Sequence, residues 1–208
     1  MMPYICLVLV QLLLVLDLII GAGAGVFGPG NSRLSLVNQP GEGHPVCRFD
    51  LTQRPVFLYN DSLTVFVFLE DECIISQFFT PELTRLYEKY HTQHVGFVGY
   101  FPSKETGQDQ IDWFASEFKI GFPLLPDHDK SLTKKLGITI TPEVAVWDHR
   151  ENRMIYRGRI DDSYVRVGKR KLHPQNHDLE DMINEWTLNQ SPAMPIITQA
   201  IGCFITFE

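Results

Sequence analysis

One cysteine, Cys73, lies where a buried strand is predicted to pass into a helix. A thiol at the start of a helix faces free backbone N–H groups and the positive end of the helix dipole, which stabilise a thiolate. Three carboxylates, Glu70, Asp71 and Glu72, directly precede it and oppose its ionisation. Three positions further on stands Ser76, so the motif is CxxS. The pattern fits a nucleophilic thiol, and it also fits a buried structural cysteine.

The other cysteines decide what a single thiol at this position can do. Cys203 lies in an apolar segment, residues 201–205, close to the C-terminus. If this tail returns to the fold as an added strand, it can bring Cys203 near Cys73 and supply the thiol that resolves a mixed disulfide. Cys203 can also pair with Cys47, which lies in no motif and fits a structural role. The sequence does not choose among these pairings.

A proline turn is the second candidate feature. Thr141-Pro142 directly precedes an apolar run at residues 144–147. A proline is allowed at the first position of a strand. In the cis form its turn would come close to the helix start at Cys73, whereas a trans proline would be an ordinary strand start. We take Pro142 as a candidate site residue with the isomer left open.

Periodicity predicts strands and helices in alternation. Continuous apolar runs are typical of buried strands, and spacings of three and four predict amphipathic helices. These patterns place strands at residues 65–69, 95–100, 144–147 and 154–156, and helices at 75–90, 111–118, 132–136 and 179–186. Pro81 is expected to kink the first helix, and Asp129 to cap the third. The first two strands must be parallel because a helix crosses between them, and the last two form an antiparallel edge. We therefore expect an α/β fold with a mixed central sheet flanked by helices on both faces.

Length and composition bound the remaining possibilities. The chain has 208 residues, 44% of them hydrophobic, which is globular composition. With 18 basic and 25 acidic side chains the net charge is −7, so we expect no nucleic-acid partner. Residues 1–24 read as a secretory signal, and the alternative is an uncleaved membrane anchor. A flexible linker is expected at 25–44, the globular domain at 45–190, and a C-terminal tail carrying Cys203 at 191–208.

Several segments together resemble the thioredoxin-like superfamily, and more closely the exported bacterial redoxin-domain proteins of the TlpA and AhpC/TSA type. The matching segments are residues 67–73, 80–83, 136–143, 156–162, 177–179 and 202–203. The run Arg-Gly-Arg-Ile-Asp-Asp, followed by His-Asp-Leu and a final Gly-Cys, is the most specific part. The chain departs from the family at Ile74, where a proline is usual, and at Ser76, which replaces the second cysteine of CxxC.

The resemblance implies a thioredoxin-like fold and an exported, periplasmic thiol–disulfide oxidoreductase. Its site residues would be Cys73 as the redox-active thiol, Ser76, the Pro142 turn that presents backbone to the substrate, and Cys203 as the resolving thiol. Protein thiols or disulfides would be the substrates, and an external reductant would restore the enzyme. We expect no cofactor, no metal and no stable membrane insertion after signal cleavage.

Three other functions stay open. A thiol peroxidase is disfavoured because Glu70 stands where the peroxidase pattern has a threonine, and a carboxylate would repel the thiolate. A copper-handling module would need Cys73, Cys203 and a histidine to converge, since soft thiolates suit Cu(I). A non-catalytic interaction domain is the third alternative, because Ile74 and Ser76 have replaced two family residues.

Overall fold

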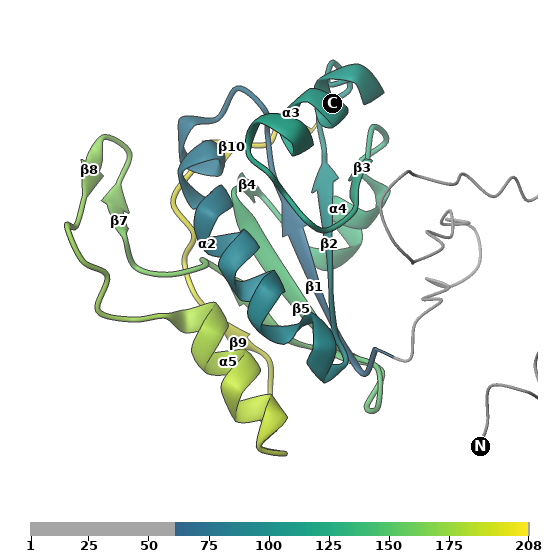
Figure 1. Cartoon of the computed structure of the whole chain (residues 1–208), viewed down its shortest axis with the longest axis vertical. Coiled ribbons are helices and arrows are strands. Elements are labelled where there is room, and N and C mark those ends of the chain that lie inside the picture. Colours follow the sequence, from purple (N-terminus) through teal and green to yellow (C-terminus); the bar gives the residue numbers. More distant parts are fainter. Residues whose placement is uncertain (1–60, 208) are drawn as a thin grey trace, which may run out of the picture. The chain divides into compact units, whose positions relative to one another are not determined.

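The computed structural model describes residues 61–207 (Figure 1). The predicted signal, the predicted linker and Cys47 lie outside the described residues. Within residues 61–207 the main sheet has six strands in the order β3-β2-β1-β5-β6-β9. Their bounds are Leu63–Phe68 (β1), Val95–Phe101 (β2), Leu124–Pro126 (β3), Glu143–Asp148 (β5), Arg153–Gly158 (β6) and Ile196–Ile197 (β9).

Four helices and one short 3-10 turn lie among these strands. The helices are α2 (Ile74–Tyr90), α3 (Gln108–Glu117), α4 (Ser131–Leu136) and α5 (Asp178–Thr187), and the turn is η1 (His91–Gln93). Two small ladders complete the described fold: β4 (Ile140–Thr141) with β10 (Cys203–Phe204), and β7 (Tyr164–Arg166) with β8 (Lys169–Arg170). None of the helices described is both long and apolar enough to cross a membrane.

The strand directions follow from the connections. β1 and β2 are parallel because α2 crosses between them, and β5 and β6 are antiparallel because a short turn joins them. Both directions were predicted. The prediction that this antiparallel pair forms the edge was wrong, because β9 from the C-terminal tail adds alongside β6 in a parallel direction.

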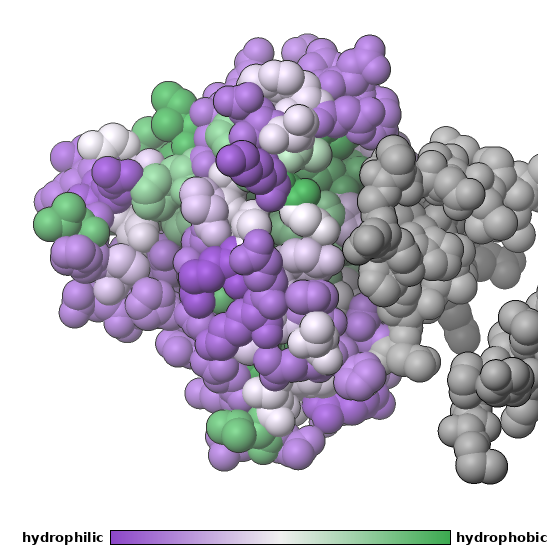
Figure 2. Space-filling view, in the orientation of Figure 1, coloured by the Kyte–Doolittle hydropathy of each residue, from purple (hydrophilic) through white to green (hydrophobic). Residues whose placement is uncertain are grey.

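Both faces of the sheet are covered, which explains why β1 is apolar throughout. Val65 and Val67 point into a core shared with α2, α3 and α5, whereas Phe66 and Phe68 point into a second core shared with α4. In Figure 1, α2 and α5 lie in front of the sheet. The face seen in Figure 2 is mostly hydrophilic, with only separate hydrophobic patches. The predicted mixed sheet with helices on both faces is confirmed.

Two local predictions concern Pro81 and Asp129: the kink at Pro81 stays a prediction, and the cap of the helix at Ser131–Leu136 needs correction. Helix α2 continues through Pro81 to Tyr90. A proline has no N–H to donate to the carbonyl four residues earlier, but the Thr80 hydroxyl donates to that carbonyl, on Gln77, at 2.8 Å. At the start of α4 the main cap is Asp127, whose carboxylate accepts two backbone N–H groups and two hydroxyls of the first turn. Asp129, the predicted cap, accepts a single N–H at 3.0 Å.

Candidate functional site

The structure joins Cys73 to Cys203 in a disulfide across 130 positions of sequence, with the two Cα atoms 6.3 Å apart. The tail makes this possible by returning as β10, which pairs antiparallel with β4 and places Cys203 opposite Thr141. Of the pairings that the sequence left open, the structure therefore contains the one across the tail. Cys47 lies outside the described residues.

A glycine lets the tail approach so closely. A Cβ atom on Gly202 would lie 2.0 Å from the carbonyl oxygen of Thr141, well inside van der Waals contact. Beyond the cysteine, the Ile205 N–H donates to the Thr139 carbonyl at 3.0 Å, and the Ile205 side chain is buried in the core on the α4 side of the sheet. The Gly-Cys pair at the end of the chain thus has a structural explanation: the glycine permits the contact and the cysteine fixes it.

Cys73 occupies the N-cap position of α2, with an extended backbone (φ −82°, ψ 109°). Its carbonyl accepts the Gln77 N–H, but no side chain caps the first-turn N–H groups, and that turn contains no acidic residue. These N–H groups and the helix dipole favour a negative charge on the sulfur. Cys73 is 2% exposed, whereas Cys203 is exposed. In the oxidised protein Cys203 is therefore the accessible half of the disulfide.

The proline turn lies beside the disulfide, as the sequence analysis expected for a cis proline. The Thr141–Pro142 peptide is cis, and the Thr141 carbonyl oxygen is 3.3 Å from the Cys73 sulfur. When the disulfide is reduced, a Cys73 thiol at this position can donate a hydrogen bond to that carbonyl. The structure thus brings Cys73, Cys203 and Pro142 together.

Ser76 takes a different position in the site. It is fully buried, and its hydroxyl accepts a hydrogen bond from the Glu70 N–H at 3.2 Å. This contact holds the loop that leads from β1 into α2. The serine of the CxxS motif therefore supports the loop before Cys73.

Glu70 is a site residue that the sequence analysis used as an argument against a peroxidase and as one of three carboxylates that oppose ionisation of Cys73. The Thr141 hydroxyl donates to its carboxylate at 3.4 Å, which links the loop before Cys73 to the proline turn. Burial raises the pKa of Glu70; the Thr141 hydrogen bond lowers it, and the nearby carboxylates Asp71, Glu72 and Glu105 raise it further. The run of three acidic residues was the signal for this crowding, but the contact with Thr141 needs the folded sheet.

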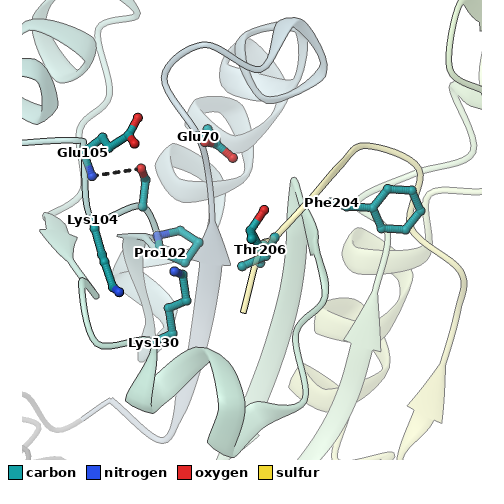
Figure 3. A pocket seen from close by; sticks show the side chains of 9 residues that line it. Glu70, Pro102, Lys104, Glu105, Lys130, Phe204 and Thr206 are labelled. Atoms are coloured by element: carbon teal, nitrogen blue, oxygen red, sulfur yellow. Dashed lines mark hydrogen bonds between the residues drawn. The ribbon is translucent and has the colours of Figure 1, made fainter. Parts of the chain in front are cut away.

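A cavity of about 260 Å³ is lined by the three tail residues that follow Cys203, Phe204 to Thr206. One wall is the tail segment that follows Cys203, and the others include Glu70, Lys104, Glu105 and Lys130 (Figure 3). Both signs of charge therefore line one small space. No sequence pattern indicated this cavity, because its walls come from four separate parts of the chain.

The copper-handling alternative gains no support from the geometry. Among residues 61–207, the one group of three metal-ligating side chains with atoms within 4.8 Å of one another is Glu82, His177 and Glu180. Neither Cys73 nor Cys203 belongs to it. Glu180 is moreover held by two ion pairs with basic side chains of α2.

Comparison with known proteins gives a fold. No family model and no curated protein matches the chain. An uncharacterized conserved protein from Geobacillus kaustophilus is similar at 23% identity and TM-score 0.61, over 71% of this chain and 78% of its own. A hypothetical protein from Sinorhizobium meliloti 1021 is similar at 21% identity and TM-score 0.60, over 70% and 79%. StoA from Bacillus subtilis is more distant, at 18% identity and TM-score 0.45, over 76% and 99%.

The strand order of the sheet and the position of Cys73 point to the same fold. A mixed sheet in which a parallel β-α-β unit is followed by an antiparallel pair, with Cys73 at the first helix start and a proline turn beside it, is the thioredoxin-like arrangement. The chain has a thioredoxin-like fold, as the sequence resemblance implied.

Proposed function

We propose that this protein is a thiol–disulfide oxidoreductase that works outside the cytoplasm and cycles between a Cys73–Cys203 disulfide and two thiols. The observation that carries the proposal is the pairing itself: a cysteine at the start of a helix, beside a proline turn, bonded to an exposed cysteine on a tail of only a few paired residues. Such a bond is accessible from the exposed Cys203 side, whereas its Cys73 side is buried in the core.

The exchange can be written with its electrons balanced. In the reduced protein the Cys73 thiolate attacks one sulfur of a substrate disulfide, and the other substrate sulfur leaves as a thiolate. Cys203 then attacks the Cys73 sulfur, releases the second substrate thiolate and reforms the Cys73–Cys203 disulfide. An external thiol reductant restores the two protein thiols. Protein disulfides are the proposed substrates, and the Pro142 turn presents backbone to them.

The first-turn N–H groups of α2 and the surrounding carboxylates act in opposite directions on Cys73. The N–H groups and dipole stabilise its thiolate, while the Thr141 carbonyl and the charge of Glu70 oppose it. We therefore expect a Cys73 thiol less acidic than one that has the helix start alone. Export is proposed from residues 1–24, which read as a cleaved signal.

The test traps the intermediate. The full chain carrying Cys203→Ser is incubated with an oxidised protein substrate, and mixed disulfides are located by mass spectrometry. We expect a stable adduct at Cys73, no adduct in Cys73→Ser, and normal turnover in the control Cys47→Ser. Turnover by Cys203→Ser at the rate of the unsubstituted chain, or adducts at Cys47 in place of Cys73, would refute the proposal.

A further inference from the structure

The cavity beside the C-terminal tail contains basic side chains, Lys104 and Lys130, that the exchange reaction does not use. The tail that carries Cys203 forms one wall, and Ile205 and Thr206 line it. Residues on a strand are about 3.3 Å apart, so Ile205 lies roughly 7 Å along the chain from Cys203. A molecule that occupies this cavity is therefore close to the exposed half of the disulfide.

Lys130 is the most unusual side chain in the cavity. It is only 8% exposed, and its backbone is fixed at the start of α4 by hydrogen bonds to Asp127 and from Lys134. Within residues 61–207 its ammonium group makes no hydrogen bond or ion pair. Figure 3 shows the side chain extending from the residue before α4 toward Pro102. The side chain of Lys130 is thus largely buried while its residue lines the cavity, and an anionic group bound there could form a charge-assisted hydrogen bond with its ammonium group.

The other charged side chains that line the cavity indicate what kind of anionic ligand it would bind. Lys104 adds a second ammonium group to the lining, while Glu70 and Glu105 supply carboxylates. A cavity that contains both signs suits a ligand that also carries both, such as an amino-acid or short-peptide group. The volume of about 260 Å³ lies just below the usual range for small-molecule sites, so the ligand must be small.

We propose that this cavity binds the carboxylate of a small peptide thiol that reduces the Cys73–Cys203 disulfide. The inference rests on the proposed function and names its reductant class. Lys130 receives the carboxylate, and the bound thiolate attacks the sulfur of Cys203. Cys73 leaves as a thiolate. A second thiolate then attacks the peptide sulfur of the mixed disulfide, and Cys203 leaves as a thiolate. Two thiols are oxidised to one disulfide while both protein cysteines are reduced.

The test compares two thiols that differ in their carboxylates. Glutathione and its diethyl ester are each mixed with the oxidised full chain, and reduction of the Cys73–Cys203 bond is followed by alkylation and mass spectrometry. Lys130→Gln removes the ammonium group at similar length. Lys135→Gln is the matched control, because it makes the same charge change on an exposed residue of α4 that does not line the cavity.

We expect Lys130→Gln to slow glutathione by about fivefold to tenfold and the ester by less than about twofold. Lys135→Gln should leave both rates within about twofold. Lys130→Glu should make the ester the faster of the two thiols, because the new carboxylate repels the carboxylates of glutathione, whereas the ester has only its amine. This reversal of the order of the two rates is a readout that a general loss of activity would not produce.

Equal slowing of both thiols by Lys130→Gln would overturn the inference, because it would indicate a general structural effect. Equal effects of Lys130→Gln and Lys135→Gln would overturn it as well. If dithiothreitol opens the disulfide but Lys130 variants leave the glutathione rate unchanged, only this inference fails. If no thiol opens the disulfide, the proposed function fails with it.

Discussion

Removing the Cys73–Cys203 bond should lower the stability of the folded chain by an amount that depends on the length of the loop it closes. The bond joins residues 130 positions apart. In the chain-entropy relation for cross-links, a loop of that length stabilises the folded state by about 5 kcal/mol at 25 °C. We use Cys203→Ser for the perturbation because Cys203 is exposed, so the serine leaves no cavity in the core.

The measured loss of stability should be smaller than this value, because the protein without the bond can relax. Only two residue pairs join β10 to β4, so the tail can detach when the bond is absent and regain conformational freedom. Detachment exposes Ile205, whose burial contributes about 2 kcal/mol. We therefore expect a loss of about 3 to 5 kcal/mol, which for a domain of this size lowers Tm by roughly 6 to 20 °C.

The assay is guanidinium unfolding with and without dithiothreitol. The oxidised chain should be the most stable form, and Cys203→Ser should match the reduced chain. Cys47→Ser, the control, should keep the full response to dithiothreitol. An oxidised chain less stable than its reduced form would refute the entropic reasoning, as would a Cys203→Ser variant equal to the oxidised chain.

Three further predictions concern Gly202 beside the disulfide, the cap of α4 and the ion pairs of Glu180. Gly202→Ala should weaken the disulfide by about 1 to 3 kcal/mol, or roughly 20 to 60 mV in a redox titration, because its Cβ would meet the Thr141 carbonyl; Gly168→Ala, on the β7–β8 turn, should leave the potential unchanged. Asp127→Ala should destabilise the chain by about 1 to 2 kcal/mol in urea unfolding, because it removes the main cap of α4, and an effect no larger than that of Asp129→Ala would contradict this. Hydrogen bonds from two basic side chains of α2 lower the pKa of Glu180 from 4.5 to about 2. Its ion pairs therefore stabilise the fold above pH 4.5 and lose this effect as the pH falls toward about 2. With the half-exposed partners allowed for, Glu180→Gln should cost about 1 kcal/mol at pH 7 and nothing near pH 2. A difference that stays constant over this range would contradict the assignment.

The layered α/β fold could be predicted because it depends on local pattern. The apolar run of β1 requires cover on both faces, and the lengths of the connections fix which strands are parallel. The start of α2 at Cys73 also follows from pattern, and so do the boundaries of α5, to within a residue.

The short strands were not predictable in the same way. β3, β4, β9 and β10 have only two or three residues each, too few to show a period. Their pairing depends on where distant segments come together. The wrong edge at β6 has this cause, because the strand beside it is two residues of the tail.

The sequence by itself determined which residue types are present for the chemistry: one thiol at a helix start, a proline turn, and a final Gly-Cys. Tertiary structure alone decided that Cys203 lies opposite Thr141 and bonds to Cys73. It also decided that Ser76 supports the loop at Glu70, and that Lys130 faces a cavity without a partner within residues 61–207. The physical reason is range: helix dipoles and strand patterns act over a few residues, whereas a disulfide and a cavity need segments far apart in sequence to meet.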